Sequence, residues 1–459
     1  MDLEDAKRQK SGKPERTQAA RGEAPGGGKS GEASTASHEN ERSGNDDACL
    51  MERVVERDNV VKALKRVQQN KGSPGIDGMT VETLRGHLRE TWPALREQLL
   101  AGAYRPQAVK RQLIPKSGGG MRELGIPTAL DRFIQQALLQ VLQPQFDPTF
   151  SPHNHGFRPG RSAHDAVREA QKYIQEGRQW VVDVDLEKFF DRVNHDVLMG
   201  RLAKRIADKR VLGLIRGYLE AGIMADGVVM DREEGTPQGG PLSPLLANVL
   251  LDEIDKELEK RGHAFVRYAD DCNVYARSQR AGERVMKTLQ RLYAQLRLRI
   301  NESKSTVARP WDRKFLGYSF WVAKDGSVRR RISDQALAAM KTRTRSITIR
   351  HGRSIASIVT ELRSYLIGWK NYFRLTEEPS TLRRLDEWIR RRLRTIQLKH
   401  WRHSTTITRE LLGRGLSLRD ARGVAKYAGR WWSSSKGPQI HAALPVRFYD
   451  SLGLPRLVT

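Results

Sequence analysis

Three aspartates, far apart in the sequence, could together support phosphoryl transfer. Asp185 ends the short apolar run Trp-Val-Val-Asp-Val-Asp, and Asp270 and Asp271 lie between two β-prone runs. Transfer of a nucleotidyl group uses divalent ions, which activate the attacking hydroxyl and steady the leaving pyrophosphate. Magnesium prefers hard oxygen ligands and keeps several waters, so two or three carboxylates at strand ends can hold it. The pattern predicts a site for two Mg²⁺ ions.

The same acids also have a plainer interpretation. Aspartate favours turns because its side chain binds nearby backbone N–H groups, so an isolated Asp-Asp pair is most often structural. Asp183 competes with Asp185 for the metal role, because alternate residues of a strand share one face. Composition and spacing leave these alternatives open.

The elements that must position these acids follow from the apolar pattern. Residues 180–184 are expected to form a strand, and 265–268 and 272–276 a hairpin with the acids at its turn. Residues 109–116 and 121–126 are expected to form another hairpin around a glycine turn. The amino-terminal two thirds should therefore be a mixed α/β unit.

Beyond residue 335 the pattern becomes helical and basic. Apolar side chains recur at spacings of 4, 3, 4 and 3 residues, which is one face of a helix: Ile358, Leu362, Tyr365, Trp369 and Tyr372. We expect a polar, disordered tail over residues 1–48, because its composition buries too little apolar surface to offset ordering. An α/β unit should follow over 49–335, and an all-α unit over 336–459.

Charge and cysteine usage narrow the class of protein. The 459 residues contain 81 Lys and Arg against 54 Asp and Glu, a net charge of +27. Such a surface suits a polyphosphate partner, because neutralising phosphates releases condensed counterions. The two cysteines lie in no CxxC pair, which excludes a four-cysteine zinc site and suits a reducing cytosol. The charged amino terminus and the lack of long apolar runs predict a soluble, cytoplasmic protein without a membrane partner.

Ordered motifs then point to a known family. Tyr268-Ala269-Asp270-Asp271 matches the YADD form of the reverse transcriptase signature. Six further blocks resemble that family in its order: the fingers hairpin Ile114-Pro115-Lys116 with Arg122 and 125–127, a second fingers block from His155 to Ser162, Asp185 to Asp191, the B motif from Gly235 to Pro244, Asn301 with Lys304, and Phe315 to Tyr318. From about residue 52 onward the chain resembles the reverse transcriptases encoded by bacterial group II introns. The resemblance implies a right-hand polymerase fold, with α/β fingers and palm and a helical thumb.

The resemblance also implies a role for individual residues. The metal ligands would be Asp185, Asp270 and Asp271, with Asp183 a neighbour. Phe190 would be a steric gate under the sugar, although an ordinary core aromatic fits the same residue. The incoming nucleotide would contact Lys116, Arg122, Gln238 and Lys304, and the template phosphates Arg158 and Arg161. A plain turn at Gln238 and a solvated lysine at residue 304 are the alternatives.

Two histidines near the second fingers block invite a separate metal interpretation. His153 and His155 are close in sequence, but no further His or Cys cluster lies nearby. An ordered loop is therefore favoured over a metal site.

The helical third resembles the thumb, or X, domain of group II intron maturases, most clearly over Gly368 to Phe373. An arginine-rich helix face that includes Arg390, Arg391 and Arg394 would follow A-form phosphates, although a solvated face is the alternative. No endonuclease segment follows, so the chain resembles the short class that lacks one. The partners implied are intron RNA, a DNA primer or target and deoxynucleotides.

The resulting hypothesis is an RNA-directed DNA polymerase that copies intron RNA into DNA and assists splicing as a maturase. Two alternatives remain. One is an RNA-binding splicing factor without polymerase activity, although its acids and B motif are intact. The other is a reverse transcriptase adopted by the host for DNA repair or defence, whose chemistry would be the same.

Overall fold

The computed structural model describes residues 49–115, 120–225, 228–230, 234–236, 239–349 and 352–458. The tail predicted over residues 1–48 lies outside these residues. Ala48–Thr459 forms one compact unit. The division predicted near residue 335 stays a prediction.

The first sheet is built on the hairpin that the sequence predicts. β1 (Val109–Pro115) and β2 (Met121–Ile126) pair antiparallel, with Ile114 opposite Arg122. β4 (Ile223–Ala225) joins β1 in parallel, and β5 (Val228–Met230) completes the order β2-β1-β4-β5. Four helices belong to this region: α2 (Leu50–Val54), α3 (Arg57–Gln69), α4 (Leu84–Leu100) and α5 (Ala129–Phe146).

The central sheet has the order β6-β7-β3-β8, and every pair in it is antiparallel. Its strands are β3 (Trp180–Val184), β6 (Ala264–Tyr268), β7 (Asp271–Ala276) and β8 (Thr306–Ala308). The strand over 180–184 and the hairpin around the acidic turn are confirmed. Asp271 is the first residue of β7 rather than a residue of the turn itself.

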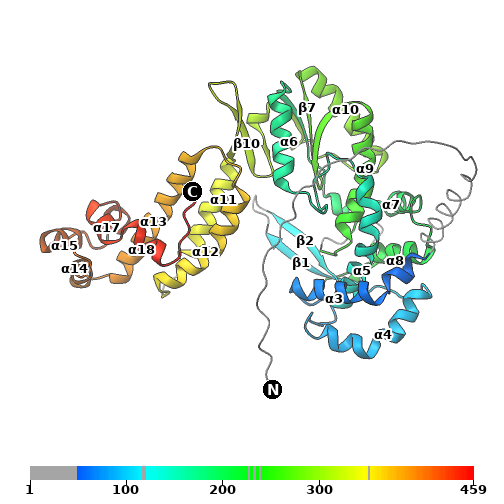
Figure 1. Cartoon of the computed structure of the whole chain (residues 1–459), viewed down its shortest axis with the longest axis horizontal. Coiled ribbons are helices and arrows are strands. Elements are labelled where there is room, and N and C mark those ends of the chain that lie inside the picture. Colours follow the sequence, from blue (N-terminus) through cyan, green and yellow to red (C-terminus); the bar gives the residue numbers. More distant parts are fainter. Residues whose placement is uncertain are drawn as a thin grey trace, which may run out of the picture. The chain divides into compact units, whose positions relative to one another are not determined.

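Both faces of the central sheet are covered, because alternate residues of its strands enter different hydrophobic cores. Val182 of β3 packs in a core with α9 (Ser243–Lys260) and α10 (Gln279–Gln295). Val181 packs in a second core with α6 (Ala163–Gln175). Figure 1 shows α6 and α10 flanking this sheet. Short elements complete the region: η1 (Asp147–Thr149), η2 (Phe189–Asp191), α7 (His195–Leu202), α8 (Lys209–Glu220) and η3 (Pro310–Asp312).

A small sheet of order β11-β10-β9 leads into the helical third. Its strands are β9 (Lys314–Phe315), β10 (Tyr318–Val322) and β11 (Val328–Ile332). The helices that follow are α11 (Asp334–Ile347), α12 (Ile355–Tyr372), α13 (Pro379–Trp401), α14 (Ser404–Leu412), α15 (Leu418–Ala425), α16 (Trp431–Ser434), α17 (Pro438–Ala443) and α18 (Val446–Ser451). The predicted change from mixed α/β to all-α structure is confirmed.

The second hydrophobic core contains residues from both the mixed α/β part and the all-α part of the chain. It joins α6 and the small sheet to the helices beyond, and includes buried Tyr318, Phe320, Ile358 and Leu362. Polar contacts run alongside it: the imidazole Nε2 of His164 lies 2.6 Å from the carbonyl oxygen of Tyr372. The helical third therefore shares a core with the central sheet.

Candidate active site

The register of the central sheet brings the predicted acids together. β3 lies directly beside β7, with Asp183 opposite Asn273 and Val184 opposite Cys272. Asp185 follows Val184, so it comes next to Asp271, which opens β7. Asp270 precedes Asp271 in the turn that joins β6 to β7. Acids that are far apart in the chain thus share one edge of the sheet.

The carboxylates at this edge repel one another. Partial burial, followed by repulsion from Asp270, Asp183 and Asp185, raises the pKa of Asp271 to about 7. The residue is nevertheless exposed at the surface, so solvent screens part of this repulsion. A group of acids that destabilise each other's charged forms is the electrostatic setting that a bound cation relieves.

Asp183 and Asp185 have different partners. The carboxylate of Asp183 accepts a hydrogen bond from Nε of Arg313 at 2.8 Å, and forms an ion pair with Nη2 at 2.6 Å. Burial raises the pKa of Asp183, and Arg313 opposes this effect. Asp185 instead lies 3.2 Å from the exposed ammonium of Lys304. This difference supports the interpretation of Asp183 as a structural neighbour.

The loop that carries Lys304 is fastened to the backbone of Asp185. The Asp185 N–H donates to the Ser305 hydroxyl at 3.0 Å, and its carbonyl accepts from the Asn301 N–H at 2.8 Å. Asn301 and Lys304, from the block after the acids, are therefore fixed beside the first acid. The backbone bonds, rather than the exposed ion pair, hold this arrangement.

The donor set suits a hard divalent cation, because it consists of carboxylate oxygens that repel one another. In the part of the chain that the structure describes, no three His, Cys, Asp or Glu side chains are arranged as a ready-made metal site. Asp185, Asp270 and Asp271 thus supply ligands of the type that magnesium prefers, but their carboxylates are not arranged around a common point.

Phe190 lies near these acids in η2, which follows the first of them. Its ring is half-buried and packs edge-on against Phe189, with ring centroids 5.0 Å apart. Its carbonyl accepts a hydrogen bond from the Thr236 N–H at 2.7 Å. The B motif thus supports the backbone of the predicted gate.

Glycine is required where the B motif meets this turn. Gly235 has a φ of +96°, and a Cβ there would lie 2.9 Å from the carbonyl oxygen of Asp191. Gly239 has a φ of +140°, and a Cβ there would lie 2.7 Å from the carbonyl oxygen of Gly125 in β2. The B motif therefore runs against both the predicted gate and the first hairpin.

Several predicted nucleotide contacts fall on parts of the chain that are not described. Lys116 and Gln238 lie outside the described residues. The backbone of Arg122 pairs with Ile114 in the β1–β2 hairpin, but the structure does not describe the position of its side chain. Their roles stay predictions.

The structure corrects the role predicted for Arg158. Only 4% of its side chain is exposed, and its guanidinium binds Asp147 at 2.8 Å and the carbonyls of Ser151 and Asn154. Because those donors are used inside the protein, Arg158 stabilises its loop and does not reach a template phosphate. Arg161 remains half-buried, and donates to the Pro152 carbonyl at 2.5 Å.

Two of the three arginines proposed for RNA binding on α13 are also corrected. Arg390 is 4% exposed and binds Asp386 at 2.9 Å. Arg394 is 4% exposed and donates to the Leu444 carbonyl at 3.1 Å. The carboxy-terminal segment covers both residues, so their positions are structural. Arg391 is half-buried, with its guanidinium 3.8 Å from the ring centroid of Trp432.

The two histidines of the second fingers block bind one carboxylate. His153 and His155 each contact Glu169 of α6, His155 at 2.5 Å, and the Tyr173 hydroxyl donates to the same carboxylate at 2.7 Å. These bonds lower the pKa of Glu169 to about 2 against the effect of burial, and raise the pKa of His153. The arrangement is the ordered loop that the sequence favours.

Sequence reasoning missed the residues that support the acidic turn from within. Arg267, Asp255 and Asn248 are buried directly beneath it, and Arg267 donates hydrogen bonds to the other two. The one available signal was an arginine immediately before Tyr-Ala-Asp-Asp, at a position where a strand should be apolar.

Two family models match the chain in succession. The model described as "Reverse transcriptase (RNA-dependent DNA polymerase)" matches residues 114–320. The model described as "Group II intron, maturase-specific domain" matches residues 337–413. The first match contains all the predicted metal ligands, and the second contains α12 and α13.

Curated proteins are similar to parts of the chain. Protein YkfC of Escherichia coli is 36% identical over 219 residues, which are 46% of this chain and 57% of that protein. The group II intron-encoded protein LtrA of Lactococcus lactis is 37% identical over 195 residues, 42% of this chain and 32% of LtrA. Nuclear intron maturase 1 of Arabidopsis thaliana is 28% identical over 32% of this chain and 27% of its own length. The matches therefore span from about a quarter to just over half the length of these relatives.

Among solved structures, a chain of a partial Cas6-RT-Cas1–Cas2 complex matches 56% of this chain and 43% of its own length, at 27% identity. Its TM-score of 0.35 is too low to support an argument. Within the described ranges, no helix has the length and apolarity needed to cross a membrane.

Proposed function

Because the chain contains a reverse transcriptase domain followed by a group II intron maturase-specific domain, we propose that it is a magnesium-dependent RNA-directed DNA polymerase encoded by a group II intron. The observation that carries this proposal is the register of β3 against β7, which places Asp185 beside Asp271 at one sheet edge. The intact acids and glycines of the B motif argue for polymerisation as well as RNA binding.

In this proposal Asp185, Asp270 and Asp271 hold two magnesium ions. When bound, these ions lower the pKa of the primer 3′-hydroxyl and neutralise charge on the leaving pyrophosphate. The protein's own residues orient the reactants. Lys304, fixed beside Asp185, is placed to give a proton or positive charge to the pyrophosphate.

Selection of the nucleotide depends on a second set of side chains. The ring of Phe190 lies under the sugar and leaves no room for a 2′-hydroxyl, which favours deoxynucleotides. Lys116 and Arg122 bind the triphosphate, Lys as a point charge and Arg as a planar fork. Gln238, between the glycines of the B motif, contacts the template base and nucleotide.

The proposed partners are the intron RNA, a DNA primer or target, and deoxynucleotides. The net charge of +27 supports a polyanionic partner. The maturase-specific domain supports a role in folding and splicing of that RNA. Cytoplasmic action is part of the proposal, since Cys49 and Cys272 are both free thiols.

Primer extension provides the direct test. Purified protein should extend a DNA primer on an RNA template in the presence of Mg²⁺ and deoxynucleotides, and should not do so after chelation. An RNA of candidate flanking sequence, incubated with and without the protein, tests the maturase role separately. Splicing without extension would reject the polymerase proposal, and extension without any effect on splicing would reject the maturase role.

A further inference from the structure

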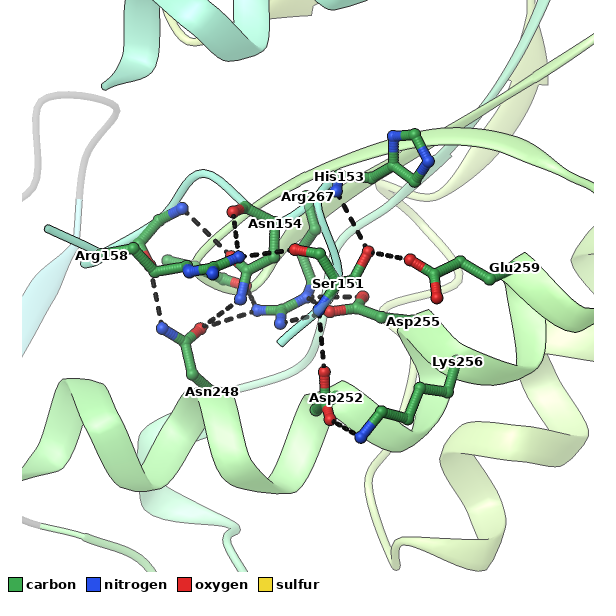
Figure 2. Close-up of polar contacts among 12 residues, drawn as sticks. Ser151, His153, Asn154, Arg158, Asn248, Asp252, Asp255, Lys256, Glu259 and Arg267 are labelled. Atoms are coloured by element: carbon green, nitrogen blue, oxygen red, sulfur yellow. Dashed lines mark hydrogen bonds and ion pairs between the residues drawn. The ribbon is translucent and has the colours of Figure 1, made fainter. Parts of the chain in front are cut away.

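A buried polar network lies directly behind the turn that carries Asp270 and Asp271. Its centre is Arg267 of β6, which is 0% exposed, and its partner is Asp255 of α9, also 0% exposed. Figure 2 shows this pair together with Asn248 and the loop that contains Ser151, Asn154 and Arg158. A charged pair removed so completely from water must be held by specific contacts.

The guanidinium of Arg267 connects three separate elements. Its Nε and Nη2 donate to the two oxygens of Asp255 at 2.8 and 2.5 Å. Its Nη1 donates to the side-chain oxygen of Asn248, also on α9, at 3.0 Å. The same Nη1 donates to the carbonyl oxygen of Ala269 at 2.9 Å. This last bond reaches the turn itself, one residue before Asp270.

Ala269 needs such support because of its backbone conformation. Its φ is +58°, a left-handed region that L side chains other than Asn and Asp seldom adopt. Gly156 packs against the same turn so closely that a Cβ at residue 156 would lie 2.1 Å from the Ala269 nitrogen. The turn is therefore hydrogen-bonded to Arg267 on one side and in close contact with Gly156 on the other.

Asn248 fixes the Gly156 side of this arrangement. Its Nδ2 donates to the Gly156 carbonyl at 2.9 Å, and its Oδ1 accepts from Asn154 at 3.2 Å. The backbone of Arg267 also bonds to this loop, through the carbonyl of His153 and the N–H of His155, each at 2.9 Å. The guanidinium of Arg267 and the side-chain amide of Asn248 thus hold the two segments that contact each other at the turn, Ala269 and Gly156.

The helix that carries Asn248 and Asp255 also begins at the B motif. α9 starts at Ser243, whose hydroxyl lies 3.1 Å from that of Thr236. The N–H of Thr236 in turn holds the carbonyl of Phe190. The network consequently links the predicted nucleotide gate to the predicted metal-binding turn through one rigid helix.

Stability alone does not account for this pair. A buried ion pair is often no more stabilising than apolar side chains of similar volume, because desolvation opposes its attraction. Apolar side chains could not donate to the Ala269 carbonyl. We propose, on the basis of the polymerase function above, that Arg267 is a positioning residue: held by Asp255 and Asn248, it fixes Ala269 and so sets the positions of Asp270 and Asp271 for metal binding.

The double variant Arg267→Met/Asp255→Leu tests this proposal, because it replaces the whole pair and leaves no unpaired buried charge. We expect a melting temperature close to that of the unchanged protein. Affinity for Mn²⁺, measured by calorimetry on the protein bound to template and primer, should fall at least tenfold. In primer extension, kcat should fall at least tenfold and the Mg²⁺ concentration for half-maximal rate should rise, while KM for deoxynucleotides stays within twofold.

Arg210→Met/Asp208→Leu is the control for the loss of an arginine–aspartate pair elsewhere in the chain. Asp208 is buried, Arg210 is partly exposed, and Nη2 of Arg210 lies 2.9 Å from Oδ2 of Asp208. This control should keep Mn²⁺ affinity and kcat. If Arg267→Met/Asp255→Leu does not fold, Arg267→Lys replaces it, because an ammonium keeps the charge beside Asp255 but cannot span Asp255, Asn248 and Ala269 together. It should show the same losses in smaller degree.

A folded variant with unchanged Mn²⁺ affinity and kcat would overturn the positioning role. A purified, unchanged protein that extends no primer would instead reject the proposed function. The two failures are therefore distinguishable.

Discussion

The ammonium of Lys304 lies 3.2 Å from Oδ2 of Asp185, with 64% and 35% of the two side chains exposed. An ion pair in this setting contributes about 0–1 kcal/mol to stability. Stability therefore does not explain the position of Lys304. Under the proposed function, its ammonium lies next to a predicted metal ligand, where pyrophosphate would depart.

Lys304→Met should separate these two roles. We expect the melting temperature to stay the same, because the ion pair is exposed. The rate of single-nucleotide incorporation should fall by about 100-fold, the low end of the contribution of a general acid. Lys324→Met, at another exposed lysine, should have no effect on the rate. Unchanged incorporation by Lys304→Met would mean that Lys304 is only a solvated lysine.

Asp270→Asn should remove primer extension while leaving RNA affinity nearly unchanged. An amide is a weaker metal ligand than a carboxylate, and loss of a preorganised electrostatic group costs about 100- to 1,000-fold in rate. Extension assays and RNA titrations at fixed salt give the two readouts. Glu302→Gln, which removes the same charge at an exposed position, serves as the control. Normal extension by Asp270→Asn would make the metal assignment wrong.

Phe190→Val should weaken discrimination against ribonucleotides. Removing the ring opens space for a 2′-hydroxyl, and a steric preference of this size corresponds to about 10- to 100-fold in kcat/KM. Competing incorporation of a ribonucleotide and its deoxynucleotide measures the ratio. Phe189→Leu, at a neighbour that is 3% exposed, should lower stability and leave this ratio as it was. An unaltered ratio in Phe190→Val would identify Phe190 as a core residue only.

Arg158→Ala and Arg161→Ala should behave differently despite their nearness in sequence. Arg158→Ala removes the buried hydrogen bonds to Asp147 and to the carbonyls of Ser151 and Asn154, so the free energy of unfolding should fall by about 3 kcal/mol. Arg161→Ala, at an exposed hydrogen bond, should change it by less than about 1 kcal/mol. Denaturant titration gives both values. Equal, small losses would contradict the structural role of Arg158.

The two-histidine cluster predicts a pH dependence of stability. The hydrogen bond that His153 donates to the Glu169 carboxylate raises the pKa of His153 above its ordinary value of 6.5. Its stabilising contribution is therefore complete below pH 6.5 and is lost as pH rises through the higher, folded-state pKa. The Glu169 pKa of about 2 acts in the opposite sense, so that its contribution is present above pH 4.5 and is lost as pH falls towards 2.

The melting-temperature difference between the unchanged protein and His153→Gln should accordingly be larger near about pH 6 than near about pH 9. His403→Gln, at an exposed histidine, supplies the comparison. A difference that grows towards high pH would reject the charged His153–Glu169 pair.

The strands that carry the acids could be predicted from local pattern, because the run ending at Asp185 and the runs beside Asp270–Asp271 are apolar and short. The pairing of β3 with β7, which makes the acids neighbours, is a long-range contact. Before the structure, only the resemblance to a known family indicated it. The glycines of the B motif were also informative, since positive φ at Gly235 and Gly239 leaves no practical alternative.

Which individual arginines are buried and which are exposed could not be predicted in the same way. Arg390, Arg391 and Arg394 look alike in the sequence, and all suit a basic surface. Two of them are buried because residues about 50 positions later fold back over α13, where the Leu444 carbonyl accepts from Arg394. Likewise, nothing local pairs Arg267 with Asp255, because their contact depends on how β6 packs against α9.

The core that unites α6 and β10 with α12 has a practical meaning for dissecting this protein. A fragment ending at residue 335 would uncover Phe320, and one beginning at 336 would uncover Ile358. Each fragment would expose an apolar surface and be prone to aggregate, so dividing the gene at this point would not yield two independently folded fragments. The proposed polymerase and maturase roles are better separated by single substitutions in the whole chain.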